Sequence, residues 1–290
     1  MLSWGPFRPS PTTSEPRPPV AAPKVDPSLP AAPLRVDVGG VLFDVLTQDA
    51  AEDYMIQSAQ AGRGGWVITA NLDHARRAVG EVEYGEMCRE ADLVLADGMP
   101  IVWAAKIQGT PLPERVAGSA LTEPLARKAA GTDLSLFILG GTEGTAAAAA
   151  SLLENRYPGL QIAGTYCPPF GFERDAEQMA LIRRELKRTR PALIYVALGS
   201  PKQERLIREL RVEHPQAWFI GIGISLSFLI GEIPRAPRWM QATGLEWAHR
   251  LAHEPRRLFW RYIIAGLPHA AKLLGGAAVR RMRGVSQPAR

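Results

Sequence analysis

Residues 66–71 read WVITAN and residues 93–98 read LVLADG, and these two stretches decide the fold class. Each begins with an apolar run that predicts a buried strand, and each ends in polar side chains. In an open parallel sheet, residues just past the carboxyl ends of the strands collect at one crevice, where ligands bind. We therefore expect Thr69, Asn71 and Asp97 to converge.

The same alternation continues along the chain. Strands are predicted near 66–69, 92–96, 134–140, 160–165, 192–198 and 217–222, with helices near 73–90, 99–107, 118–130, 144–156, 173–189 and 201–213. A short hairpin is predicted around residues 39–40, followed by a helix that Asp49 caps. Strands separated by helices of this length predict an α/β fold, Rossmann-like, with a mostly parallel sheet flanked by helices.

Composition divides the chain into four parts. Residues 1–33 hold 10 of the 25 prolines and predict a disordered leader. Residues 34–230 carry the α/β pattern and form the predicted catalytic domain. A basic helical appendage is expected over 231–274 and a disordered basic tail over 275–290.

The distribution of charge points to a polyanionic partner. From Gly231 to Arg290, eleven Lys or Arg against three acids give +8, and since the whole chain is +5, residues 1–230 carry −3. Anionic lipid and nucleic acid both suit such a segment. Because it shows no nucleic-acid reading motif, we expect no nucleic-acid partner.

The apolar run at residues 262–279 contains Pro268, His269 and Lys272. We expect it to lie on an anionic membrane surface rather than span the bilayer. The alternative is an ordinary amphipathic helix packed on the domain.

The sequence contains no motif typical of a disulfide framework, a metal site, a serine hydrolase or a Walker-type nucleotide site. Cys88 and Cys167 are too few for a disulfide framework or a metal cluster. His249 and His253 have i,i+4 spacing but lack the neighbouring Glu and the third ligand of a zinc protease. There is no GxSxG elbow, Walker loop or secretory h-region, so a cytoplasmic protein with no metal and reduced thiols is expected.

Two glycine-containing loops follow predicted strands. Residues 139–144 read LGGTEG, where Gly140 and Gly141 would let backbone amides approach a phosphate at a helix N-terminus. A plain tight turn is the alternative. Residues 198–204 read LGSPKQE, whose Gly-Ser-Pro is explained by helix capping, whereas Lys202 and Gln203 would face the crevice and hold a sugar or phosphate oxygen.

Arginines supply the expected positive charge. Arg115, in the segment PERV at 113–116, can stand beside Asp97, and this pair suits an anionic substrate and removal of a hydroxyl proton. Arg250, Arg257 and Arg261 have spacings of 7 and 4, which stacks them on one helical face for phosphate capture. Pro255 can interrupt that helix, so only Arg257 and Arg261 are securely predicted to share a face. A solvated basic face is the alternative to phosphate capture.

Taken together, these motifs resemble the WecG/TagA/CpsF family, glycosyltransferase family 26. The matching segments span about residues 36–265 and are 69–71 with His74, 91–98, 111–118, 140–141, 199–204, 221–223, 235–237 and 244–247. Ordered motifs over such a length are highly specific, unlike any one of them alone.

The resemblance implies an inverting glycosyltransferase that needs no metal or other cofactor. It would move a sugar from a UDP-sugar to a polyprenyl-diphosphate-linked saccharide, for cell-surface or exopolysaccharide biosynthesis, on the inner face of the cell membrane. Asp97 matches the family's proposed base, and we expect it to be ionised at pH 7 with an ordinary pKa. The pocket residues are matched by Thr69, Asn71, Arg115 and Gln203, and the basic segment matches an appendage that closes over the site.

One position departs from the family. Members commonly read Gly-x-Gly-x-x-Phe-Asp after the last strand, whereas residues 221–227 read GIGISLS, so Ser227 replaces the Asp. Loss of this carboxylate counts against N-acetylmannosamine and makes glucose plausible, which keeps UDP-glucose and UDP-N-acetylmannosamine both open as donors. The sequence also leaves open a homo-oligomer.

Two other functions compete. An NAD- or SAM-dependent Rossmann enzyme is disfavoured because the glycine loop follows the third strand rather than the first. A non-catalytic nucleotide-binding, membrane-associated adaptor would leave Asp97 and Arg115 without a purpose.

Overall fold

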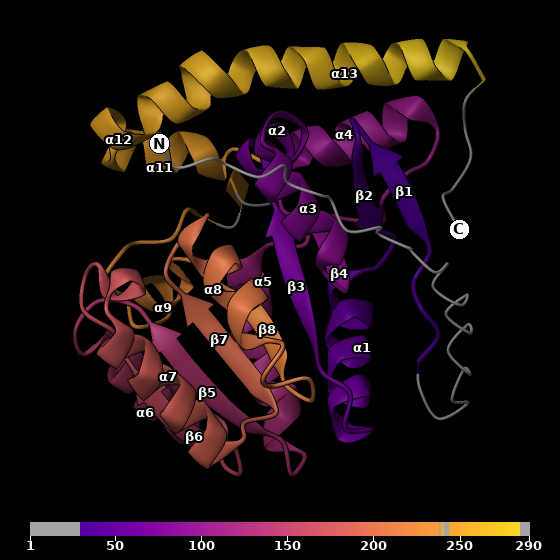
Figure 1. Cartoon of the computed structure of the whole chain (residues 1–290). Helices are drawn as coiled ribbons and strands as arrows, with labels where there is room; N and C mark the ends of the chain where they lie inside the picture. The colour runs from indigo at the N-terminus through magenta and orange to yellow at the C-terminus, as the bar shows by residue number, and fades with distance from the viewer. Residues whose placement is uncertain (1–29, 238, 241–243, 285–290) are drawn as a thin grey trace, which may run out of the picture.

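Six parallel strands form the central sheet of the computed structural model, which describes residues 30–237, 239–240 and 244–284 (Figure 1). In spatial order they are β4 (Leu93–Ala96), β3 (Gly65–Ala70), β8 (Trp218–Gly221), β7 (Leu193–Ala197), β5 (Ser135–Gly140) and β6 (Gln161–Tyr166). A separate antiparallel hairpin, β1 (Arg35–Val38) and β2 (Val41–Asp44), adjoins β4, where the buried Asp44 carboxylate accepts from Val94 N at 2.6 Å.

The central strands are apolar on both faces because helices cover both sides. In β3, Trp66 and Ile68 belong to one hydrophobic cluster and Val67 to the other. Such near-continuous apolar runs are the mark of a parallel sheet buried on both faces. The predicted Rossmann-like α/β fold is therefore confirmed.

The helices form two layers. One face carries α1 (Gln48–Gln60), α5 (Gly118–Ala130), α6 (Thr145–Arg156) and α9 (Ser225–Leu229). The other face carries α2 (Leu72–Gly80), α3 (Val82–Glu90), α4 (Met99–Gln108), the short helix η1 (Phe172–Arg174), α7 (Ala176–Thr189) and α8 (Lys202–Leu210).

Local details differ from the predictions in two places. The single helix expected over 73–90 is two helices, because the chain is extended at Glu81. Thr47, rather than Asp49, caps α1, with its hydroxyl accepting from Ala50 N at 3.2 Å. Asp49 instead pairs with Lys128 at 2.6 Å, which ties α1 to α5.

The C-terminal segment consists of α11 (Glu246–His253), α12 (Pro255–Phe259), the π-helix η2 (Trp260–Gly266) and α13 (Leu267–Met282). Figure 1 shows these helices lying beyond the carboxyl ends of the strands, with α13 running alongside α4. The helix continues past residue 274, where the appendage was expected to end, because Ala277 is still buried against the core. Residues 1–29 and 285–290, which hold most of the predicted leader and part of the predicted tail, lie outside the described residues.

Trp260–Met282 is a helical stretch of 23 residues that contains an 18-residue window with a mean hydropathy of 1.2. Within the described residues it alone is long and apolar enough to cross a membrane, and 17% of its apolar window is buried. Leu273 is on the buried side and packs on the hairpin turn, where a Cβ at Gly39 would lie 2.3 Å from Leu273 Cδ1. The packed-helix alternative therefore describes one side of α13, while Leu267, Val279 and Met282 are exposed.

Candidate active site

Asp97 stands at the carboxyl edge of the sheet, immediately after β4. Its backbone N–H donates to Ala70 O at 3.0 Å, which fixes Asp97 beside the end of β3. The loop that carries Arg115 is held to the same strand, since Val116 N donates to Ala96 O at 2.8 Å. Arg115 Nη1 consequently lies 3.5 Å from Asp97 Oδ1.

Thr69 and Gly118 complete the wall beside this pair. Thr69 is buried, and a Cβ on Gly118 would lie 2.8 Å from Thr69 Oγ1. Only glycine leaves room for the backbone at residue 118 to lie this close to Thr69. At this position the Gly118 N–H donates to the Asp97 carboxylate. The predicted convergence of Thr69 and Asp97 is therefore present in the structure.

Glu246 is a member of this cluster to which the sequence analysis gave no role. It begins α11. Its Oε2 lies 3.2 Å from Arg115 Nη1, whereas Asp97 Oδ1 lies 3.5 Å from the same nitrogen. The side chains of Asp97, Arg115 and Glu246 are 24%, 17% and 14% exposed. The sequence signal for this residue is the segment 244–247 (GLEW), a family motif that contains the carboxylate of Glu246.

Asp97 does not have the ordinary pKa that we expected. Burial raises the pKa of its carboxyl to about 7, and the charge of Glu246 adds to that rise. Arg115, Arg250 and the Gly118 N–H act in the opposite direction without cancelling it. A carboxyl that titrates near neutral pH is suited to accept a proton and release it again.

Asn71 caps α2, so its side-chain oxygen is already engaged in hydrogen bonds within the protein. Its Oδ1 accepts from Asp73 N at 3.0 Å and from His74 N at 3.2 Å, while Asn71 N donates to His74 Nδ1 at 3.2 Å. Burial lowers the pKa of His74, which favours the neutral imidazole that can accept this bond. The Asn71 side-chain nitrogen is the group that is left to contact a ligand.

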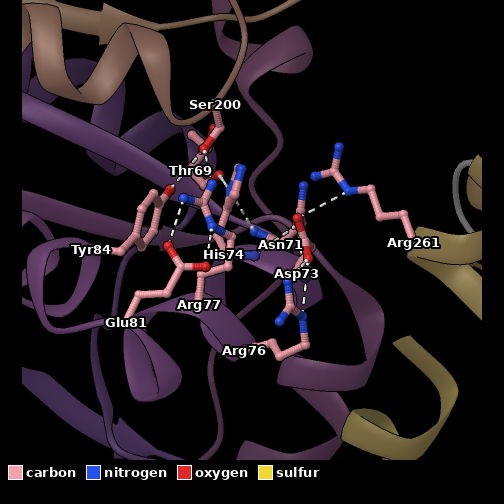
Figure 2. A network of polar contacts seen from close by, with 10 residues as sticks. All are labelled: Thr69, Asn71, Asp73, His74, Arg76, Arg77, Glu81, Tyr84, Ser200 and Arg261. Carbon is pink, nitrogen blue, oxygen red and sulfur yellow. Dashed lines mark hydrogen bonds and ion pairs between the residues drawn. The ribbon is translucent and has the colours of Figure 1, made fainter. Parts of the chain in front are cut away.

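Figure 2 shows the polar network that surrounds Asn71 and ties three parts of the chain together. Arg77, on α2, donates to Ser200 Oγ at 3.4 Å, and Tyr84, on α3, lies 3.2 Å from the same hydroxyl. Arg261 reaches from η2 to Asp73, with its Nε 3.1 Å from Asp73 Oδ2. In this arrangement Arg261 anchors the C-terminal segment to α2.

Lys202 and Gln203 point to different neighbours. Gln203 is buried, accepts from Gly223 N at 3.2 Å and donates to Glu204 Oε1 at 3.0 Å, so it fastens the loop after β8. Lys202 Nζ lies 3.1 Å from Glu173 Oε1 and 4.9 Å from the centre of the Phe170 ring. Lys202 therefore contacts the loop after β6 rather than Asp97.

The glycine loop after β5 passes close to the end of β7. Gly140 and Gly141 have φ of +103° and +87°, and a Cβ on Gly140 would lie 2.6 Å from Ala197 O. The Glu232 carboxylate lies at the start of α6, where it accepts a hydrogen bond from Thr145 Oγ1 at 3.2 Å. The N-terminus of α6 is thus next to an anionic group of this protein.

The three C-terminal arginines do not share one helix. The chain leaves α11 after His253 and begins α12 at Pro255, as the proline suggested. Arg250 lines a narrow cleft with Glu246 and Ile224, and its buried Nε has no hydrogen-bond partner within the described residues. The side chain of Arg257 lies outside the described part of the structure.

The structure thus brings Thr69, Asp97, Arg115 and Arg250 together with Glu246, while the other predicted site residues whose side chains are described lie on the surrounding loops and helices. No group of three or more His, Cys, Asp or Glu that could hold a metal ion occurs in the described ranges. A titrating carboxyl between guanidinium groups can deprotonate a hydroxyl beside an anionic leaving group.

Comparison with known proteins gives two kinds of match. Residues 36–283 match the model of the Glycosyl transferase WecG/TagA/CpsF family. The chain is 32% identical over 214 residues to the N-acetylglucosaminyldiphosphoundecaprenol N-acetyl-beta-D-mannosaminyltransferase of Bacillus spizizenii, covering 71% of this chain and 80% of the relative. It is 29% identical over 211 residues to the protein of that name from Bacillus subtilis, covering 73% and 79%.

Proposed function

Because the chain belongs to the WecG/TagA/CpsF glycosyltransferase family, we propose that it transfers N-acetylmannosamine from UDP-N-acetylmannosamine to N-acetylglucosaminyl-diphosphoundecaprenol. Family membership decides against the NAD- or SAM-dependent enzyme and the non-catalytic adaptor. The observation that carries the proposal is the Asp97–Arg115 pair at the carboxyl edge of the sheet, within the region shared with relatives of that named activity.

The geometry supports a single displacement with Asp97 as base. The acceptor hydroxyl attacks the anomeric carbon, the bond from that carbon to the UDP oxygen breaks, and Asp97 takes the hydroxyl proton. Attack from the face opposite UDP inverts the anomeric centre. Arg115 and Arg250 are the guanidinium groups beside Asp97, and they offset the negative charge that develops on the departing diphosphate.

N-Acetylmannosamine is favoured over glucose by the names of both relatives, although Ser227 replaces the expected Asp. Ser227 lies in α9, where its backbone donates to Ile224 O at 3.1 Å and accepts from Ile233 N at 3.2 Å. These backbone bonds do not depend on the side chain, so the loop after β8 keeps its conformation with Ser at this position.

A donor comparison tests this assignment. With a short-chain polyprenyl-diphosphate-N-acetylglucosamine acceptor, we expect product from UDP-N-acetylmannosamine and little from UDP-glucose, measured by mass spectrometry. Ser227→Asp is the matched variant, and it should keep the same donor preference. Transfer of glucose by the parent protein, with N-acetylmannosamine transfer only by Ser227→Asp, would show that the lost carboxylate sets the donor.

We also propose that the outer side of the C-terminal segment lies on an anionic membrane, with the protein peripheral on the cytoplasmic face. Trp260, Leu267 and Met282 are exposed along this stretch, and Arg281 and Arg283 are exposed beside them. Apolar insertion and attraction of cations to acidic headgroups act together in such a helix. This arrangement brings the site to an acceptor whose lipid stays in the bilayer.

Vesicle binding tests the membrane proposal without removing the segment, which also supplies Glu246 and the buried Leu258. Each cation near an anionic surface contributes about 1 kcal/mol, so Arg281→Gln with Arg283→Gln should weaken binding to anionic vesicles by about 30-fold. The matched control is Arg184→Gln with Lys187→Gln, which removes the same charge from α7. Equal co-sedimentation of both double variants would show that these arginines do not face the membrane.

A further inference from the structure

We propose that Glu246 is a positioning residue of the transfer reaction: it enters the site from the C-terminal segment and shares the Arg115 guanidinium with the base, Asp97. The proposal deepens the proposed function, since it rests on Asp97 acting as the base. It assigns to the C-terminal segment a part in the chemistry that is separate from membrane contact.

Asp97 and Glu246 share one nitrogen atom of Arg115. Arg115 Nη1 is 3.2 Å from Glu246 Oε2 and 3.5 Å from Asp97 Oδ1. Glu246 is the closer partner, so the guanidinium charge is shared between two carboxylates and does not act on Asp97 alone. A lone Arg115–Asp97 pair would hold the carboxyl in its ionised, weakly basic form.

The local backbone fixes Glu246 in this place. The chain before α11 passes so close to α4 that a Cβ on Gly244 would lie 2.3 Å from Met99 Cγ, and Gly244 has φ of +75°. Leu245 N donates to Met240 O at 2.8 Å and closes the turn before the helix. Glu246 then begins α11, where the helix dipole favours a carboxylate.

Two cations, one anion and one backbone amide face Asp97. Arg115 comes from the loop before α5, the Gly118 N–H from the start of α5, and Glu246 and Arg250 from α11. Glu246 supplies the negative charge among these groups, and it acts in the same direction as burial of the Asp97 carboxyl. Replacing Glu246 by a neutral residue leaves two cations and one amide facing Asp97.

Loss of the Glu246 charge favours ionised Asp97, so its pKa should fall from about 7 in Glu246→Gln, by on the order of one pH unit. Glu246→Asp keeps the charge but shortens the side chain, so it should weaken the Arg115 contact while moving the titration of Asp97 much less. A purely structural role for Glu246 would not separate these two variants in this way.

The experiment is a carbon-13 NMR titration of the side-chain carboxyl of labelled aspartate in the full chain. The Asp97 signal is assigned by its absence in Asp97→Asn. We expect a midpoint near 7 in the parent protein and in Glu246→Asp, and a lower midpoint in Glu246→Gln. Equal midpoints in the parent protein and Glu246→Gln would overturn the proposal.

The titration needs no donor or acceptor, so it gives its answer even if the sugar assignment is wrong. Where transfer is measured with whichever donor the protein uses, the acidic limb of the kcat/KM profile of Glu246→Gln should move to lower pH by the same amount. Its plateau at high pH should be lower, because a less basic carboxylate is a weaker proton acceptor.

Discussion

Asp97→Asn is expected to reduce kcat by about a hundredfold or more, the usual loss when a general base is removed. The amide has nearly the same shape as the carboxyl and can still accept from the Gly118 N–H, but it cannot take the acceptor proton. Because the parent pKa is about 7, transfer by the parent protein should rise between pH 6 and pH 8 along the titration of one group. Initial rates across this range measure both effects, and the variant should lose the rise.

The matched control for this prediction is Asp133→Asn, an exposed carboxylate at the opposite edge of the sheet, which should leave kcat unchanged. Thermal unfolding should show that Asp97→Asn is folded. A folded-state pKa raised above the unfolded value means that stability from this group is lost as the pH rises from about 4 toward 7, so the Asn variant should not be less stable at pH 8. Near-normal turnover in a folded Asp97→Asn protein would rule out the role of base.

The fold was accessible from the sequence because parallel strands buried on both faces leave an unbroken apolar signal. The runs around Trp66, Val94 and Val196 predicted strands that the structure places within a residue or two. Boundaries set by side-chain contacts were less accessible. The start of α1 depends on whether the side chain of Thr47 or that of Asp49 accepts from the free backbone amides. Thr47 accepts, and Asp49 pairs with Lys128 instead.

The candidate site was predictable where it follows the strand ends and not where it depends on distant segments. Thr69 and Asp97 converge because β3 and β4 are neighbours, which the α/β pattern implied. Glu246 is 131 residues beyond Arg115 in sequence, so periodicity cannot connect them. The raised pKa of Asp97 depends on burial and on the charge of Glu246, and both exist only in the folded chain.

Arg115→Ala is expected to reduce kcat/KM by about a hundredfold to a thousandfold at pH 7, as when a preorganised donor to developing negative charge is lost. Two effects combine in this loss. Asp97 and Glu246 would face each other without the guanidinium that they share, and Arg250 would be the remaining cation, so the pKa of Asp97 should rise above 7 and leave less base at neutral pH. The departing diphosphate would also lose a guanidinium partner.

Measuring the Arg115→Ala rate at pH 7 and pH 9 separates these effects, because only the first is reversed by raising the pH. We expect partial recovery at pH 9, and the loss that persists there measures the contribution of Arg115 to the charge on the leaving group. Arg115→Lys is the matched control: it keeps a cation near Asp97 but lacks the planar fork that binds a diphosphate, so it should show the persistent loss with little pH-dependent part. Since Arg115 and Arg250 supply the positive charge in this mechanism, activity of the parent protein should survive excess EDTA. A full requirement for added Mg²⁺ or Mn²⁺ would assign that charge to a metal ion and contradict the role given to Arg115.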